Sequence, residues 1–172
     1  AKQNMQIIMP ERLNTMFDDM AASATPKSRA IYDVAGTKIE FAEIMTMAAH
    51  YLELRAQLDT TNLEWQSTAG LFAHEFIADY PKAMFYFQRI LLQAIKQEGA
   101  VSEWVAYAYN GIGYTYNNQG DYPKALEYYN KALDIRKQVS GQDNPVVAQY
   151  YSNIGTVYCN QGNYPKALEN LT

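Results

Sequence analysis

Residues 105–127, VAYAYNGIGYTYNNQGDYPKALE, return as residues 147–169, VAQYYSNIGTVYCNQGNYPKALE, and this repetition decides the fold. The two copies agree at 15 of 23 positions, and the Ile-Gly pairs that begin at Ile112 and Ile154 lie 42 residues apart. A constant period of this length is typical of repeat proteins, in which one unit cannot bury its apolar face alone and stacks on the next. We therefore expect a stack of similar units.

The period extends upstream of these two copies. Residues 79–83, DYPKA, are identical to residues 121–125 and precede them by 42 residues. Before Leu63 the agreement is scattered, so we expect residues 1–62 to form an N-terminal helical cap, with a degenerate repeat as the alternative. Its helices are expected at residues 11–22 and 28–58, the second interrupted near Gly36. The repeats then occupy residues 63–104, 105–146 and 147–172, the last one truncated.

Each unit has the pattern of a helix hairpin. Val105, Ala108 and Ile112 follow helical spacing, Gly120 can end that helix in a left-handed conformation, and Pro123 suits the first turn of the next. We expect Gly113 to lie where the two helices approach closely, with Leu71 in its place in the first unit. The predicted fold is all-α, an α-solenoid of stacked antiparallel hairpins, with helices at 63–77 and 81–98, 105–119 and 123–139, and 147–161 and 165–172.

Composition excludes several classes of function. Of the 172 residues 48% are hydrophobic, and the formal net charge is −4, which leaves no positive surplus to neutralise phosphates or coat an anionic bilayer. We therefore expect neither nucleic-acid binding nor membrane insertion. Cys159 is the only cysteine, which suits a reducing compartment, and we expect a cytoplasmic protein.

No group of residues has the spacing of a catalytic or metal site. His50 and His74 are the only histidines, and Glu75 beside His74 is the sole potential ligand near either of them. We interpret both as structural residues and expect no metal and no cofactor. Cys159 has no histidine partner nearby in the sequence, so we do not expect an enzyme.

The repeated residues resemble the tetratricopeptide repeat. The second unit holds the family's pattern at Tyr109, Ile112-Gly113, Tyr116, 120–122 and 125–127, and the third unit repeats it 42 residues later. The family's ordinary unit has about 34 residues. The longer unit, with Ala-Leu-Asp-Ile-Arg at 132–136 and Gly-x-x-x-Pro-x-x-Ala at 141–148, looks like the kinesin light chain variety.

The resemblance implies a protein-protein interaction module, in which the first helix of each unit lines a concave groove that binds a peptide or protein segment. Carried over by position, the groove would present Tyr107, Asn110, Tyr114, Asn117, Asn118, Gln149, Ser152, Asn153, Thr156 and Asn160, with Cys159 on its wall. Asn153 stands where the family often has asparagine, whereas the second unit has Gly111 there. The first helices contain no Lys or Arg, so the cationic clamp of some family members cannot be built.

Two other functions remain open. The chain could be a regulatory or ligand-sensing segment of a larger multidomain protein, enzymes included, or a purely architectural repeat that associates with itself. Because the third hairpin stops near the middle of its second helix, we expect apolar surface to be exposed there, at Tyr151, Ile154, Tyr158, Leu168 and Leu171. Self-association through this end is the consequence to test.

Overall fold

The structure, a computed structural model, describes residues 31–34 and 37–171. The chain divides into two compact units, Ala1–His50 and Tyr51–Thr172. In the first unit β1 (Ile31–Val34) and β2 (Thr37–Glu40) form a two-stranded antiparallel sheet in which Ile31 pairs with Glu40. α2 (Phe41–Leu58) follows at once, and its buried Ile44 and Ala48 lie one helical turn apart.

The two β-strands correct one prediction. We expected helix from residue 28 to residue 58 with a break near Gly36, but residues 31–34 and 37–40 are strands and helix begins at Phe41. The segments IYDV and TKIE are rich in β-branched and aromatic residues, and the second alternates them with polar ones, which favours strands over helix. The helix predicted at residues 11–22 lies outside the described residues.

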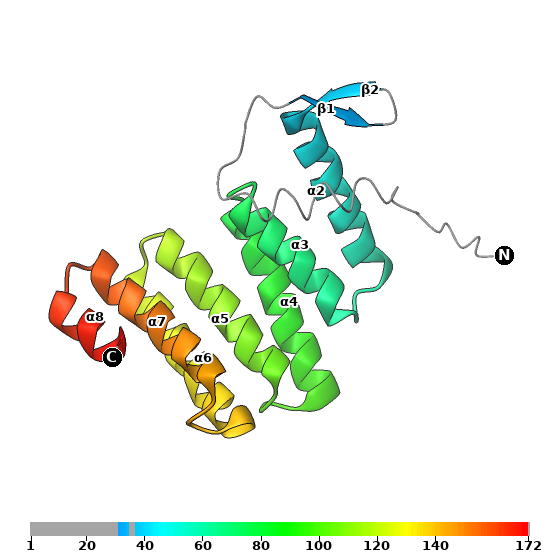
Figure 1. The fold of residues 1–172 in the computed structure, drawn as a ribbon. Coiled ribbons are helices and arrows are strands. Elements are labelled where there is room, and N and C mark those ends of the chain that lie inside the picture. Colours follow the sequence, from blue (N-terminus) through cyan, green and yellow to red (C-terminus); the bar gives the residue numbers. More distant parts are fainter. Residues whose placement is uncertain (1–30, 35–36, 172) are drawn as a thin grey trace. The chain divides into compact units, whose positions relative to one another are not determined.

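The second unit is a helical solenoid. Three hairpins follow one another, and in Figure 1 their helices lie side by side in chain order from α3 in green to α8 in red. We call the first helix of each hairpin the A helix and the second the B helix. The pairs are α3 (Leu63–Glu75) and α4 (Tyr80–Glu98), α5 (Glu103–Asn118) and α6 (Tyr122–Ser140), and α7 (Pro145–Asn160) and α8 (Tyr164–Leu171). The prediction of an all-α helical-repeat solenoid is confirmed.

The turns between A and B helices repeat with the period of the sequence. Gly120 and Gly162 adopt positive φ angles of 78° and 74°, and Ala78, at the same place in the first hairpin, has φ of 54°. The Asp79 and Asp121 side chains then accept hydrogen bonds from the backbone N–H of Lys82 and Lys124, which begins the B helix. Ala78 therefore holds a conformation that costs a residue with Cβ free energy.

The core lies between consecutive hairpins. Phe87 and Ile90 of α4 pack with Val105 and Ile112 of α5, and Tyr129 and Leu133 of α6 do the same with α7. The predicted close crossing at Gly113 is present, because a Cβ there would lie 2.9 Å from Tyr129 Cδ1. Apolar burial in these layers is the main stabilising contribution to the stack.

The first hairpin makes its close crossing one residue earlier than predicted. Leu71, the counterpart of Gly113, is exposed, and Gly70 lies at the crossing instead, where a Cβ would be 3.1 Å from Tyr86 Cβ. The large and small residues are exchanged between these two adjacent positions. The first hairpin therefore keeps the crossing without a glycine at the repeat position.

The last residues of α2 belong to the second unit and are fixed by Gln66 of α3. The fully buried Gln66 amide donates to the carbonyl oxygen of Ala56 at 2.7 Å and to that of Asp59 at 3.3 Å. These carbonyls lie at the end of α2, where no intrahelical donor remains for them. Ala56 also packs with Ala69 and Tyr86.

Candidate functional site

Polar side chains join the three A helices to one another. Ser67 Oγ lies 2.6 Å from the Tyr107 hydroxyl, and the Asn118 amide nitrogen lies 3.1 Å from His74 Nε2. One repeat further, the Asn153 amide donates to Asn110 Oδ1 at 2.8 Å and the Asn160 amide to Asn117 Oδ1 at 3.1 Å. Each bond connects one repeat to the next, so this row of polar groups runs across the stack.

The groove residues expected from the resemblance all lie on α5 and α7, and we call this set the A-helix face. They differ in exposure and in contacts. Exposed members are Asn118, Gln149, Ser152, Thr156 and Asn160; half-buried members are Tyr107, Asn110, Tyr114 and Asn153; Asn117 is buried. Ser152 and Thr156 donate only to carbonyls one turn earlier in α7, those of Ala148 and Ser152.

Gly111 occupies the position in the second repeat that Asn153 occupies in the third, and the Phe87 ring beside it explains why. A Cβ on Gly111 would lie within 2.7 Å of three ring atoms of the fully buried Phe87. No side chain fits beside this ring without displacing it. Asn110, the preceding residue, bonds to Asn153 instead, so the asparagine pair forms at a spacing of 43 residues rather than 42.

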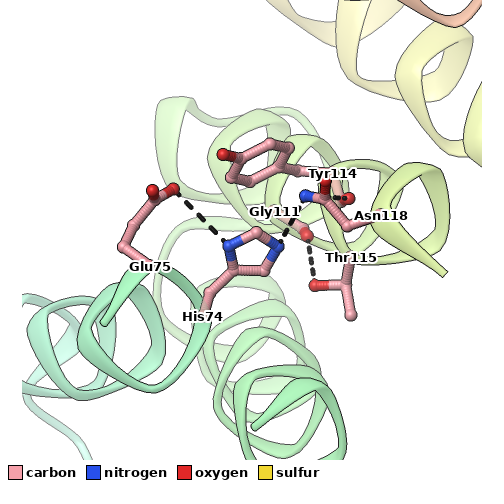
Figure 2. A network of polar contacts seen from close by, with 6 residues as sticks. All are labelled: His74, Glu75, Gly111, Tyr114, Thr115 and Asn118. Atoms are coloured by element: carbon pink, nitrogen blue, oxygen red, sulfur yellow. Dashed lines mark hydrogen bonds and ion pairs between the residues drawn. The ribbon is translucent and has the colours of Figure 1, made fainter. Parts of the chain in front are cut away.

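Figure 2 shows a second part of the row, centred on His74. The His74 ring is buried, stacks on the Tyr114 ring with 4.0 Å between centroids, and lies beside Tyr80 of α4 at 5.3 Å. Because the Asn118 amide donates to Nε2, the ring proton must be on Nδ1, which lies 3.5 Å from Glu75 Oε1. The interpretation of His74 as a structural residue did not anticipate this connection between repeats.

Burial controls protonation in this network. Desolvation lowers the pKa of His74, against a smaller opposing effect of the Glu75 charge, so the imidazole is neutral at neutral pH. Burial, followed by hydrogen bonding to Glu75 and its negative charge, raises the pKa of Tyr114 to about 12. Burial also raises the pKa of Tyr107. Glu75 is thus the group in this network that carries a charge.

The first repeat, residues 63–104, contributes a further set of residues to the A-helix side of the stack. Moving the five positions from α5 back by 42 residues gives Trp65, Thr68, Phe72, Glu75 and Phe76. Phe72 and Phe76 stack with centroids 5.1 Å apart, and Glu75 and Phe76 are exposed. The repeat period contained this signal. At these positions the first repeat therefore has aromatic and acidic side chains, unlike the other two repeats.

Two further kinds of feature, a metal site and a membrane-spanning helix, are not found among the described residues. In that part of the chain no three His, Cys, Asp or Glu side chains are grouped so that they could hold a metal ion. No described helix combines the length and apolar character needed to cross a membrane. The network around His74 contains neutral hydrogen-bonding groups and a single carboxylate, which suits recognition of another molecule.

Comparison with known proteins identifies the repeats in the C-terminal part of the chain. Residues 104–172 match the tetratricopeptide repeat model. No curated protein shows significant similarity to the chain.

Solved structures with similar folds include BtubC (BKLC) from P. vanneervenii, with a TM-score of 0.64 and 24% identity over 76% of this chain and 56% of that one. Two structures of MamA match with TM-scores of 0.53. One has 25% identity over 76% of this chain and 66% of its own, and the other has 26% over 75% and 61%. The chain thus spans less than two thirds of the length of each. With their repeat period, paired helices and matching model, residues 104–172 consist of tetratricopeptide repeats, and these repeats support a protein-protein interaction module.

Proposed function

We propose that the A-helix face binds a peptide segment of a partner protein, extended or helical, in a groove lined by the A helices. The observation that carries this proposal is the row of exposed amides and hydroxyls on α5 and α7, of which Gln149, Ser152 and Thr156 bond to no other helix in the structure described. Neutral donors and acceptors of this kind suit the backbone of a bound peptide, and the tyrosines suit stacking against it.

The charge of the A helices favours a particular kind of partner. α3, α5 and α7 contain no Lys or Arg. A carboxylate is held strongly by fixed cations together with amide donors, so we propose that this module does not act as a clamp for a C-terminal carboxylate. Binding should then depend only weakly on salt concentration.

Three finer points belong to the same proposal. The 42-residue unit resembles the kinesin light chain variety, and residues 1–62 are proposed as a cap before three repeats that begin at Leu63. The module is proposed to act by binding alone, because the matching family is one of interaction repeats and no catalytic family accompanies it. The activity of any longer protein that contains it is a separate question.

A test of the groove needs substitutions that leave the stack intact. Asn110, Asn117 and Asn153 would be obvious targets, but alanine at these positions also removes hydrogen bonds between repeats. Ser152 and Thr156 are better targets because both are exposed and make only local bonds. Arginine at both positions should fill the groove without disturbing the core.

The experiment is selection of a random 12-residue peptide library displayed on phage, followed by titration of a selected peptide by fluorescence anisotropy. We expect the Ser152→Arg, Thr156→Arg variant to lose binding by tenfold or more. The matched control, Asn130→Arg with Gln138→Arg, adds the same two positive charges at exposed positions of the B helix α6 and should bind normally. Equal affinity of both variants would move the binding site off the A helices.

A further inference from the structure

Glu75 is an exposed carboxylate with no positive charge on its own or the neighbouring A helices. It is the first-unit counterpart of Asn117, and 44% of its side chain is accessible. Of the other acidic residues on the A helices, Glu103 pairs with Arg136 at 2.8 Å, and Glu64 lies in the first turn of α3, at the opposite end from Glu75. Glu75 is also the last residue of α3, where the helix dipole places partial negative charge.

The groups next to Glu75 do not neutralise its charge. His74 Nδ1 is buried, has no hydrogen-bond partner within normal distance, and points at Glu75 Oε1 from 3.5 Å. The imidazole is neutral because burial lowers its pKa, and the Tyr114 hydroxyl stays protonated because burial and the Glu75 charge raise its pKa. Both groups are neutral and leave the Glu75 charge uncompensated, so the carboxylate oxygens remain free to accept from a cation.

An aromatic ring stands next to this charge. Figure 2 shows Glu75 and the Tyr114 ring beside the same imidazole, one from α3 and the other from α5. Tyr114 is half-buried, so part of it remains accessible. A carboxylate and an aromatic ring around one position attract a cation by ion pairing and by the cation–π interaction.

We propose that Glu75 and Tyr114 form a subsite for one Lys or Arg side chain of the bound peptide. This inference rests on the proposed function, because Glu75 and Tyr114 lie on α3 and α5, two of the A helices that line the proposed groove. The neutral part of the groove, on α5 and α7, would hold the peptide backbone, and the subsite would fix its register. A partner segment would then have a mostly uncharged stretch, which lies on α5 and α7, and a basic residue at the end that lies nearest α3.

The same phage library tests this inference. Peptides selected by the wild-type protein should be enriched in Lys or Arg at one position, and selection on Glu75→Gln should lose that enrichment. The matched control is Glu64→Gln, which removes an exposed carboxylate from the other end of α3 and should keep the enrichment. Selected peptides without a basic preference, or a preference that survives Glu75→Gln, would overturn the subsite alone. Failure to select any peptide would overturn the proposed function with it.

A titration with a substituted peptide complements the selection. Replacing the enriched basic residue of one selected peptide by norleucine should weaken binding to the wild-type protein about five- to tenfold, the range for a partly exposed ion pair beside an aromatic ring. The same replacement should change binding to Glu75→Gln by less than about twofold. Equal losses on both proteins would show that the basic residue binds elsewhere.

Discussion

Replacing Gly111 by alanine should destabilise the protein, although alanine is the better helix former. Alanine in the interior of a helix gains about 0.5–1 kcal/mol over glycine. At Gly111, however, the new methyl group would lie within 2.7 Å of three atoms of the Phe87 ring, which is fully buried. Overpacking of this kind costs about 1–3 kcal/mol, so we expect a net loss of about 0.5–2 kcal/mol.

Gly155→Ala is the matched control. A methyl group there would lie 3.0 Å from Leu171 Cγ and 3.3 Å from the Ala167 carbonyl oxygen. Leu171 is half exposed in the last turn of α8, so its side chain can move, and the backbone contact needs a shift of only a few tenths of an ångström. The helix-forming gain should then dominate, and this variant should be neutral or slightly more stable. Urea denaturation followed by circular dichroism gives the free energies of unfolding of both variants.

A double-mutant cycle assigns the effect to the ring. Gly111→Ala should cost less in a Phe87→Leu background, because leucine leaves room for the methyl group, and the coupling energy should exceed about 0.5 kcal/mol. If Gly111→Ala were as stable as Gly155→Ala, or if the cycle showed no coupling, the explanation of Gly111 by the Phe87 ring would be wrong.

Three further predictions concern a turn, a histidine and the surface of α8. Ala78→Gly should raise the unfolding free energy by about 0.5–1 kcal/mol, because Ala78 has φ of 54°, and Gly120→Ala should lower it similarly; melting curves would test both. Because burial lowers the pKa of His74 from 6.5, the unfolded chain binds a proton that the folded chain does not, so stability should fall as pH drops below about 6.5. His74→Gln should flatten this dependence in denaturation series from roughly pH 7.5 to 5.5, and an unchanged slope would count against it. Finally, the exposure expected at the end of the third hairpin is found at Leu168 and Leu171, whereas Ile154 is buried and Tyr151 and Tyr158 are half-buried. Lysine at Leu168 and Leu171 should reduce any self-association of this chain in light scattering; an unchanged molar mass in an associating sample would exclude this surface.

The repeat period predicted the regular part of the fold well. Residues with a fixed local role recur every 42 positions, such as Asp79 and Asp121 at the start of a B helix and Gly120 and Gly162 in the turn. Their effects depend on neighbours within a few residues, so sequence alone reveals them. The bounds of the six helices from α3 onward were accordingly close to those expected.

Contacts between repeats were harder to predict because they depend on offsets of a single residue. Asn153 bonds to Asn110 instead of the counterpart position Gly111, and Gly70 makes the crossing expected at Leu71. The hydrogen-bond partner of His74 is Asn118, which lies 44 positions later in the sequence. The strands at 31–34 and 37–40 were not predicted for a different reason, since each is only four residues long and fell within a longer stretch interpreted as helix.

The central claim, that partners bind to the A-helix face, can be tested directly with the single cysteine of the chain. Cys159 is exposed on α7, and its rate of alkylation by iodoacetamide reports access to that helix. A selected peptide at saturating concentration should slow alkylation of Cys159 several-fold and leave the rate unchanged in a Cys159→Ser, Gln138→Cys variant, whose thiol lies on α6. An unchanged rate at Cys159 together with protection on α6 would contradict the account.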